Sequence, residues 1–246
     1  MVRTICAGAL ALTLSVGIAA AATPADSGKR AVGKVATKAK GAKGAGSIGK
    51  AAAMTDAGGP LVAVLETTQG TIVIKFLDGD APKTAANFRK LVREHFYDGT
   101  CFHRVIRGFM IQGGDPNSKN DDPNDDGVGG PGYTVPAEIK AKHVRGSVAT
   151  ARLGDQGNPS RASSGSQFFI DVAPQASLDA GGYTVFGQVI SGMEAVDKIV
   201  AFSDDGTLPA AGGGGRNPGK KAMIKTARLE PLAKWEKAAP AAGSTP

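Results

Sequence analysis

Cysteine is scarce in this chain of 246 residues, which contains only Cys6 and Cys101. Cys6 lies inside a predicted signal peptide, so cleavage would leave Cys101 without a partner in the same chain. A mature chain with one cysteine has no internal disulfide, which excludes the small disulfide-stapled folds common among secreted proteins. Its folded part must therefore be stabilised by a hydrophobic core.

Histidine and aromatic residues are also few. The three histidines form no cluster with the spacing of metal ligands, so we expect no catalytic metal and no cofactor. No nucleophile elbow is present, which argues against a serine hydrolase. Aromatic residues make up 5% of the chain, whereas glycine occurs 35 times. This composition favours a turn-rich β architecture over a helical bundle.

Long apolar runs are absent apart from one at the N-terminus. Arg3 is followed by a mostly apolar stretch over residues 5–18 and by four alanines at positions 19–22. A short basic region, an apolar region and small residues in this order predict a signal peptide over residues 1–22, cleaved near Ala22. We therefore expect export to the periplasm, with an uncleaved N-terminal anchor as the alternative.

Residues 23–59 predict a disordered basic linker. They consist mainly of Ala, Gly, Lys, Thr and Ser and lack the branched and aromatic residues that form a core. Most of the net charge of +7 lies here and at Arg3, so the rest of the chain is nearly neutral. We expect no nucleic-acid binding by the folded domain. The linker is a solvated spacer or, alternatively, makes weak electrostatic contact with anionic envelope polymers.

A glycine-rich segment of the linker, residues 44–50, has the spacing of a phosphate-binding loop. Such a loop follows a hydrophobic strand and ends before Ser or Thr, but no strand precedes this one and Ala51 follows it. The segment is therefore interpreted as part of the linker.

The pattern of apolar residues predicts a folded domain over residues 60–231. Two strands, 61–67 and 71–77, are joined by a hairpin turn, and a helix begins at Pro82 and ends near Tyr97. Short apolar runs then alternate with glycine-rich turns, before a second helix over 193–201 and a last strand over 222–229. Residues 232–246 predict a flexible tail in which Trp235 is able to dock locally.

Several motifs occur together and in a fixed order. Residues 102–115 read FHRVIRGFMIQGGD and residues 165–170 read GSQFFI, and Leu178-Asp179 and Val185-Phe186-Gly187 follow. These segments, with residues 81–88 and 129–133, resemble the cyclophilin family. The resemblance implies a mainly β fold, a closed eight-stranded antiparallel barrel capped by two α-helices, with an active groove on its outer face. It also implies a peptidyl-prolyl cis–trans isomerase.

The chemistry of that reaction needs no nucleophile and no metal. Rotation about a peptide bond is opposed by a barrier of roughly 18–20 kcal/mol, because the nitrogen lone pair is shared with the carbonyl. A twisted amide loses this sharing, and a positioned guanidinium can stabilise it by donating hydrogen bonds. The resemblance assigns this role to Arg104, and it places Phe109 and Gln112 beside it as catalytic residues.

The resemblance also assigns substrate-binding positions, and the chain departs from its relatives at some of them. The expected contact residues are Met110, Ala151, Arg152, Gln167, Phe169, Leu178 and Tyr183. Alternation in the GSQFFI segment predicts that Phe168 points inward and Phe169 towards the groove. Arg152 stands where many relatives carry Asn, Tyr183 where animal relatives carry His, and Ser177 where they carry Trp. The loss of that Trp predicts weak binding of cyclosporin.

Two functional alternatives remain. The domain could bind or hold proline-containing polypeptides, its expected partners, with catalysis only incidental. Residues 122–127, DPNDDG, match the opening of a calcium-binding loop, but Tyr133 stands at the twelfth position, where a glutamate ligand is required. An acidic surface turn is the favoured interpretation. We expect a monomer.

Overall fold

The structure is a computed structural model that describes residues 59–204, 208–209 and 214–236. The expected signal peptide lies outside the described residues, and so does the expected linker except for Gly59. Both remain predictions. Within the described ranges, no helix has the length and apolar character needed to cross a membrane.

The described residues are mostly β-structure. The strands are β1 Leu61–Thr67, β2 Gly70–Phe76, β3 Arg104–Ile106, β4 Met110–Gly113, β5 Thr134–Val135, β6 Ser147–Thr150, β7 Ser163–Ser164, β8 Phe168–Asp171, β9 Val185–Ser191, β10 Leu208–Pro209, β11 Arg216–Asn217 and β12 Ile224–Pro231. The α-helices are α1 Pro82–Arg93, α2 Ala176–Gly181, α3 Met193–Ala201 and α4 Leu232–Glu236. Short 3₁₀ turns lie at Pro116–Lys119, Phe202–Asp204 and Gly219–Ala222.

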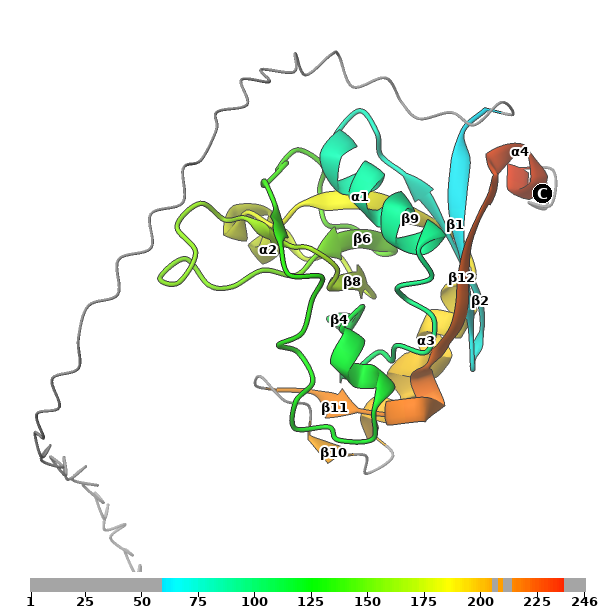
Figure 1. The fold of residues 1–246 in the computed structure, drawn as a ribbon, viewed down its shortest axis with the longest axis vertical. Helices are drawn as coiled ribbons and strands as arrows, with labels where there is room; N and C mark the ends of the chain where they lie inside the picture. Colours follow the sequence, from blue (N-terminus) through cyan, green and yellow to red (C-terminus); the bar gives the residue numbers. More distant parts are fainter. Residues whose placement is uncertain (1–58, 205–207, 210–213, 237–246) are drawn as a thin grey trace, which may run out of the picture. The chain divides into compact units, whose positions relative to one another are not determined.

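Ten strands form one curled antiparallel sheet, in the order β10-β11-β3-β4-β8-β6-β9-β2-β1-β12 (Figure 1). The mainly β prediction is therefore confirmed, but the closed eight-stranded barrel with two helices is not what forms. In the described part of the chain, the segments before β3 and β12 are joined by an isolated bridge between Cys101 and Met223 and by a few backbone hydrogen bonds around it, not by a ladder between the two strands. Because β11 pairs with the outer edge of β3, that edge has no room for a full ladder with β12.

The main core fills the inside of the curled sheet. On β1 and β2, Ala63, Leu65, Ile72 and Ile74 face this core, as the alternation in the sequence predicts. Helix α1 covers the core through Phe88, whose ring contacts four other aromatic rings, those of Phe76, Tyr97, Phe168 and Phe186. Aromatic residues are few in this chain, and five of them meet at this point.

The two longer helices differ in how well their ends were predicted from the sequence. Helix α3 begins and ends at the predicted residues, and it follows Gly192, whose φ of 93° is one that residues with a Cβ rarely adopt. Helix α1, in contrast, ends at Arg93 rather than near Tyr97. His95 takes a left-handed conformation with φ 56°, and Phe96 N donates to Leu91 O. This turn ends the helix although the apolar periodicity continues.

The outer face of β1 and β2 is covered by the C-terminal helix α4. Val62, Val64 and Val73 form a small apolar cluster there with Leu232, and Trp235 packs against it. Residues 232–236 were expected to belong to a flexible tail, but they form a helix. The local docking of Trp235 is confirmed, and residues 237–246 lie outside the described part.

Candidate active site

The register of four neighbouring strands determines which side chains face the groove. Directly opposed residues on β3, β4, β8 and β6 form one row across the sheet: Arg104, Gln112, Phe169 and Ala149. The adjacent row faces the core and consists of Val105, Ile111, Ile170 and Val148. Because side chains alternate along a strand, the first row lies on the outer face. Phe168 accordingly packs in the main core and Phe169 does not.

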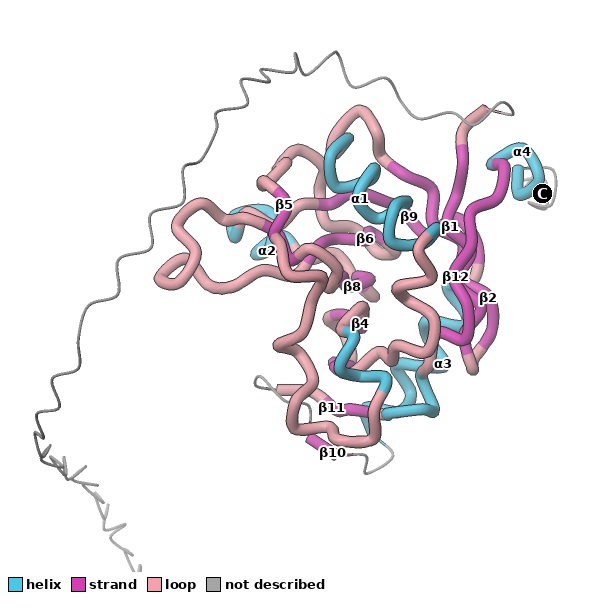
Figure 2. The backbone as a smooth tube through the Cα atoms, in the orientation of Figure 1, coloured by secondary structure: helices cyan, strands magenta, loops and turns pink. Residues whose placement is uncertain are grey.

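A cavity of about 300 Å³ lies over this outer face. It is lined by His103, Arg104, Phe109, Met110, Gln112, Gly127, Ala151, Arg152, Phe169, Leu178 and Tyr183. Nine of the ten residues expected from the sequence are among them. Gln167 is the exception, and it lies beside the cavity, in contact with Gln112. Figure 2 shows that much of the chain between β4 and β8 is loop, and Gly127, Ala151 and Arg152 come from these loops.

Arg104 is held at one end of the cavity by defined polar contacts. Its Nε donates to Gly214 O at 3.0 Å, and a terminal nitrogen donates to Gln112 Oε1 at 3.3 Å. Gln112 in turn donates to Gln167 Oε1 at 3.0 Å, and Gln167 donates to Gly129 O at 2.8 Å. Burial lowers the pKa of Arg104, although a guanidinium stays charged in proteins. The contacts therefore present a fixed positive group to the cavity.

One wall of the cavity is apolar. Met110 is 1% exposed and Phe169 is 4% exposed, and both belong to a cluster that also includes Ala149 and Val185. Phe109 and Leu178 pack against this cluster from the β3–β4 turn and from helix α2. An apolar surface of this kind suits a compact apolar ring that offers no hydrogen-bond donor, such as that of proline.

Arg152 lies against the ring of Tyr183 rather than pointing into solvent. The centre of its guanidinium is 4.7 Å from the ring centroid, and its nitrogens lie 2.7 Å from Asp155 Oδ1 and within hydrogen-bond distance of Gly181 O. The side chain is 6% exposed. The polar contacts of Arg152 are thus directed largely to the protein itself, where they hold Tyr183 and the end of α2.

The sequence pattern did not single out His103 or Gly127 as residues of the cavity wall. Burial lowers the pKa of His103 to about 4, so this imidazole is neutral at neutral pH and adds no charge beside Arg104. His103 is 1% exposed, which suits a residue that supports the wall rather than one that contacts substrate. Its position next to Arg104 in the chain was the only signal available.

The acidic turn over residues 122–127 does not gather its carboxylates around one point. Asp122 accepts hydrogen bonds from the backbone and side chain of Asn124, whereas Asp126 accepts from Asn217 Nδ2 at 2.6 Å. Among the described residues, no group of three or more His, Cys, Asp or Glu side chains is arranged to hold a metal ion.

Residues 62–228 match the family model of the cyclophilin-type peptidyl-prolyl cis–trans isomerases, over more than half of the chain. The chain belongs to this family. A peptidyl-prolyl cis–trans isomerase from Synechococcus elongatus is 50% identical over 127 residues, which cover 51% of this chain and 78% of the relative. One from Helicobacter pylori is 39% identical over 142 residues, covering 56% and 78%.

Solved cyclophilin structures agree with this assignment. A cyclophilin-type isomerase from Cryptosporidium parvum superposes with a TM-score of 0.57 at 27% identity, covering 70% of this chain and 98% of its own. The same protein in the presence of the dipeptide Ala-Pro gives a TM-score of 0.56, also at 27% identity, covering 69% and 98%. Membership in the cyclophilin family makes this chain an isomerase of peptidyl-prolyl bonds. It does not by itself assign the roles of individual groove residues.

Proposed function

We propose that this cyclophilin isomerises Xaa-Pro bonds by a non-covalent mechanism in which Arg104 stabilises the twisted amide. The observation that carries the proposal is the position of a fixed guanidinium at the edge of an apolar cavity. The proline ring rests on Phe109, Met110 and Phe169, which keeps it still while the preceding residue rotates. Proline-containing polypeptides are thus the proposed substrates.

The mechanism follows from the change in the amide during rotation. In the planar amide the nitrogen lone pair is delocalised, but in the twisted state it is localised and can accept a hydrogen bond. Arg104 donates more strongly to this state than to the planar one, so it lowers the barrier instead of merely increasing affinity. Gln112 orients the guanidinium and keeps a polar group near the substrate backbone. No bond is broken and no proton is transferred.

Exchange spectroscopy by NMR on a short Xaa-Pro peptide tests the proposal. The wild type should speed cis–trans exchange, and Arg104→Ala should reduce the catalysed rate about a hundredfold, as removal of a transition-state donor commonly does. Arg107→Ala removes the same charge from an exposed position three residues away and is the matched control. It should leave the rate within about twofold of wild type.

The competing function, a module that binds or holds proline-containing segments, has a different outcome. The wild type would then bind the peptide without speeding exchange, and Arg104→Ala would change affinity alone. Either result would contradict the proposed mechanism.

We further propose that the enzyme acts on exported proteins outside the cytoplasm, most simply in the periplasm. The N-terminal sequence supports this, since Arg3, the apolar stretch and the alanines before Thr23 have the order of a cleavable signal. Cell fractionation with N-terminal sequencing of the mature chain tests it. Recovery of uncleaved chain from the cytoplasmic fraction would contradict the proposal.

For the basic residues of the linker, 23–59, we propose a weak contact with anionic envelope polymers. The support is their net positive charge in a chain whose remainder is nearly neutral. Retention on an anionic polymer should fall steeply with salt and disappear when residues 23–58 are deleted. Equal retention of the full and shortened chains would show that the linker is only a spacer.

A further inference from the structure

A buried pair of titratable side chains, His143 and Asp171, lies behind the groove and is not used by the mechanism above. Both side chains are fully shielded from solvent, and His143 Nδ1 is 2.8 Å from Asp171 Oδ2. Asp171 is on β8, opposite Met110 of β4, and His143 belongs to the loop before β6. Because a buried polar group needs a partner, each of the two side chains holds the other in place.

The imidazole of His143 also contacts the aromatic rings of the groove. It stacks on the ring of Phe169 with an interplanar angle of 9° and a centroid separation of 5.8 Å. It makes a T-shaped contact with the ring of Tyr183, at 87° and 6.4 Å between centroids, and the centroids of the Phe169 and Tyr183 rings are themselves 5.9 Å apart. Phe169 and Tyr183 line the cavity, and His143 does not. His143 therefore supports the aromatic wall from within the protein.

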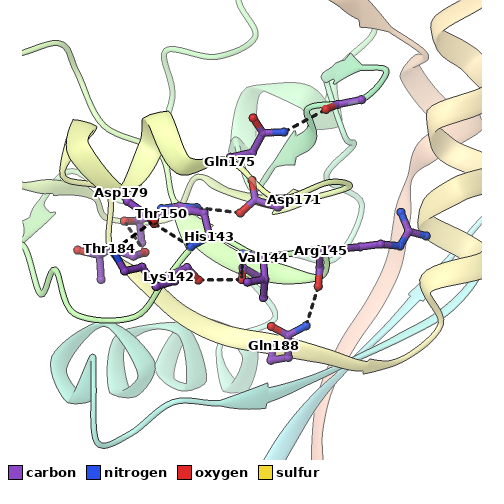
Figure 3. A network of polar contacts seen from close by, with 12 residues as sticks. Lys142, His143, Val144, Arg145, Thr150, Asp171, Gln175, Asp179, Thr184 and Gln188 are labelled. Atoms are coloured by element: carbon purple, nitrogen blue, oxygen red, sulfur yellow. Dashed lines mark hydrogen bonds and ion pairs between the residues drawn. The ribbon is translucent and has the colours of Figure 1, made fainter.

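The backbone of His143 fixes helix α2, which carries Leu178 into the cavity wall. His143 N donates to Asp179 Oδ1 at 2.9 Å, and Gln175 N donates to His143 O at 3.0 Å. Figure 3 shows His143 with its contacts to Asp171 and Asp179, which come from different elements. The side chain of Gln175 continues the network by donating to Gly108 O at 3.0 Å, next to Phe109.

We infer that His143, held by Asp171, is the positioning residue of the proline pocket. One residue connects the strand that carries Phe169, the helix that carries Leu178 and, through Gln175, the turn that carries Phe109. The inference rests on the proposed function, since it assigns these residues to the binding of proline. Arg104 acts on the twisted state, whereas the apolar wall binds the ring in both states. Loss of positioning should therefore raise KM and leave kcat nearly unchanged.

The test separates KM from kcat by NMR titration of an Xaa-Pro peptide with four variants. His143→Asn keeps a donor near the Nδ1 position, so Asp171 retains a partner, but it removes the ring behind Phe169. We expect KM to rise about tenfold and kcat to stay within about twofold. The ring-proton shifts of Phe169 should move as well, because the stacked imidazole is gone. Asp171→Leu removes the acceptor for Nδ1 and should raise KM similarly.

Two further variants distinguish positioning from loss of stability. Asp171→Asn keeps an acceptor for His143 and should keep KM within about twofold of wild type. The side chain of Val196, on helix α3, is fully buried in the main core. Val196→Ala leaves a cavity there and destabilises the domain. A destabilised enzyme loses active molecules, which lowers the apparent kcat but leaves KM unchanged. Val196→Ala should show that pattern.

The inference is overturned if folded His143→Asn has the KM of the wild type, or if Val196→Ala raises KM equally. These outcomes are distinct from a failure of the proposed function. If the wild type speeds exchange and Arg104→Ala abolishes it while His143→Asn changes nothing, only the positioning role falls. If the wild type does not speed exchange, the proposed function falls, and peptide affinity in the same titration still tests the role of His143.

Discussion

Acid should release helix α4 from the sheet before the rest of the domain unfolds. Glu230, near the end of β12, accepts hydrogen bonds from Trp235 Nε1 and Arg228 Nε, both at 2.8 Å, and lies 2.9 Å from Lys234 Nζ. Burial alone would raise the pKa of this carboxyl. The hydrogen bonds from Lys234, Arg228 and Trp235 outweigh burial and lower the pKa to about 2.

The direction of the pH effect follows from this lowered pKa. Released from its partners, Glu230 titrates at its ordinary pKa of 4.5. Its stabilising contribution is therefore complete above pH 4.5 and is lost as the pH falls towards 2. The full difference in pKa corresponds to about 3 kcal/mol at most. Arg228 and Lys234 are 43% and 62% exposed, so solvent screens these contacts, and we expect about 1 kcal/mol.

The fluorescence of Trp235 measures this release directly, because it is the only tryptophan in the chain. On acidification from pH 5 to 2, its emission should shift to the red while the circular dichroism of the sheet still reports a folded domain. Glu230→Gln cannot ionise, so its Trp235 emission should be shifted already at pH 7 and should change little with pH.

Glu66→Gln is the matched control for this experiment. Glu66 also pairs with Arg228, at 2.9 Å, but among the described residues the side chain that accepts the hydrogen bond of Trp235 Nε1 is that of Glu230. It should therefore keep most of the pH dependence. If wild type and Glu230→Gln gave the same acid titration of Trp235, Glu230 would not be the group that holds α4 and the reasoning would be refuted.

Two other predictions concern single side chains. Burial raises the pKa of Cys101 to about 11. An alkylating reagent at pH 8 should therefore label the native protein slowly and the denatured protein quickly. Fast labelling of the native protein would show that the thiol is accessible and would contradict this expectation. Ser177 is exposed and stands at the position where animal relatives carry Trp. Cyclosporin should therefore bind weakly, and Ser177→Trp should tighten its binding by about tenfold. Calorimetric titration measures both affinities, and tight binding by the wild type would contradict the expectation.

The groove residues were assigned from the sequence through its resemblance to the cyclophilin motifs, and four of them, Arg104, Met110, Gln112 and Phe169, lie on the adjacent strands β3, β4 and β8. Arg104 and Gln112 occur within one short hairpin, so their pairing follows from chain direction and alternation. The alternation in GSQFFI likewise separates Phe168 from Phe169. Gln167 was assigned to the substrate groove but makes its polar contacts with Gln112 and Gly129, just beside the cavity.

The global form of the sheet was harder to predict, because it depends on short segments with weak patterns. Strands β10 and β11 have two residues each, too few for an alternation to be visible, yet β11 takes the edge of β3. Helix α2 has six residues, of which Leu178 packs against an apolar cluster but none is fully buried, so the helix is too short for its sequence to show an apolar periodicity. Its position is determined by Gln175 and Asp179, whose partner is His143.

His143 shows why a positioning role leaves no local signal in a sequence. Its contacts with Asp171 and Asp179 join residues 28 and 36 positions apart. Neither contact belongs to a strand ladder or a helical repeat, so no periodicity points to it. A residue that touches substrate lies in a recognisable motif, but the residue that orients it can lie in any loop that folding brings alongside. Such residues are identified only from the buried contacts in the structure. For this reason, variants of His143 and Asp171 test how the pocket is positioned more directly than substitutions of the residues that line the cavity.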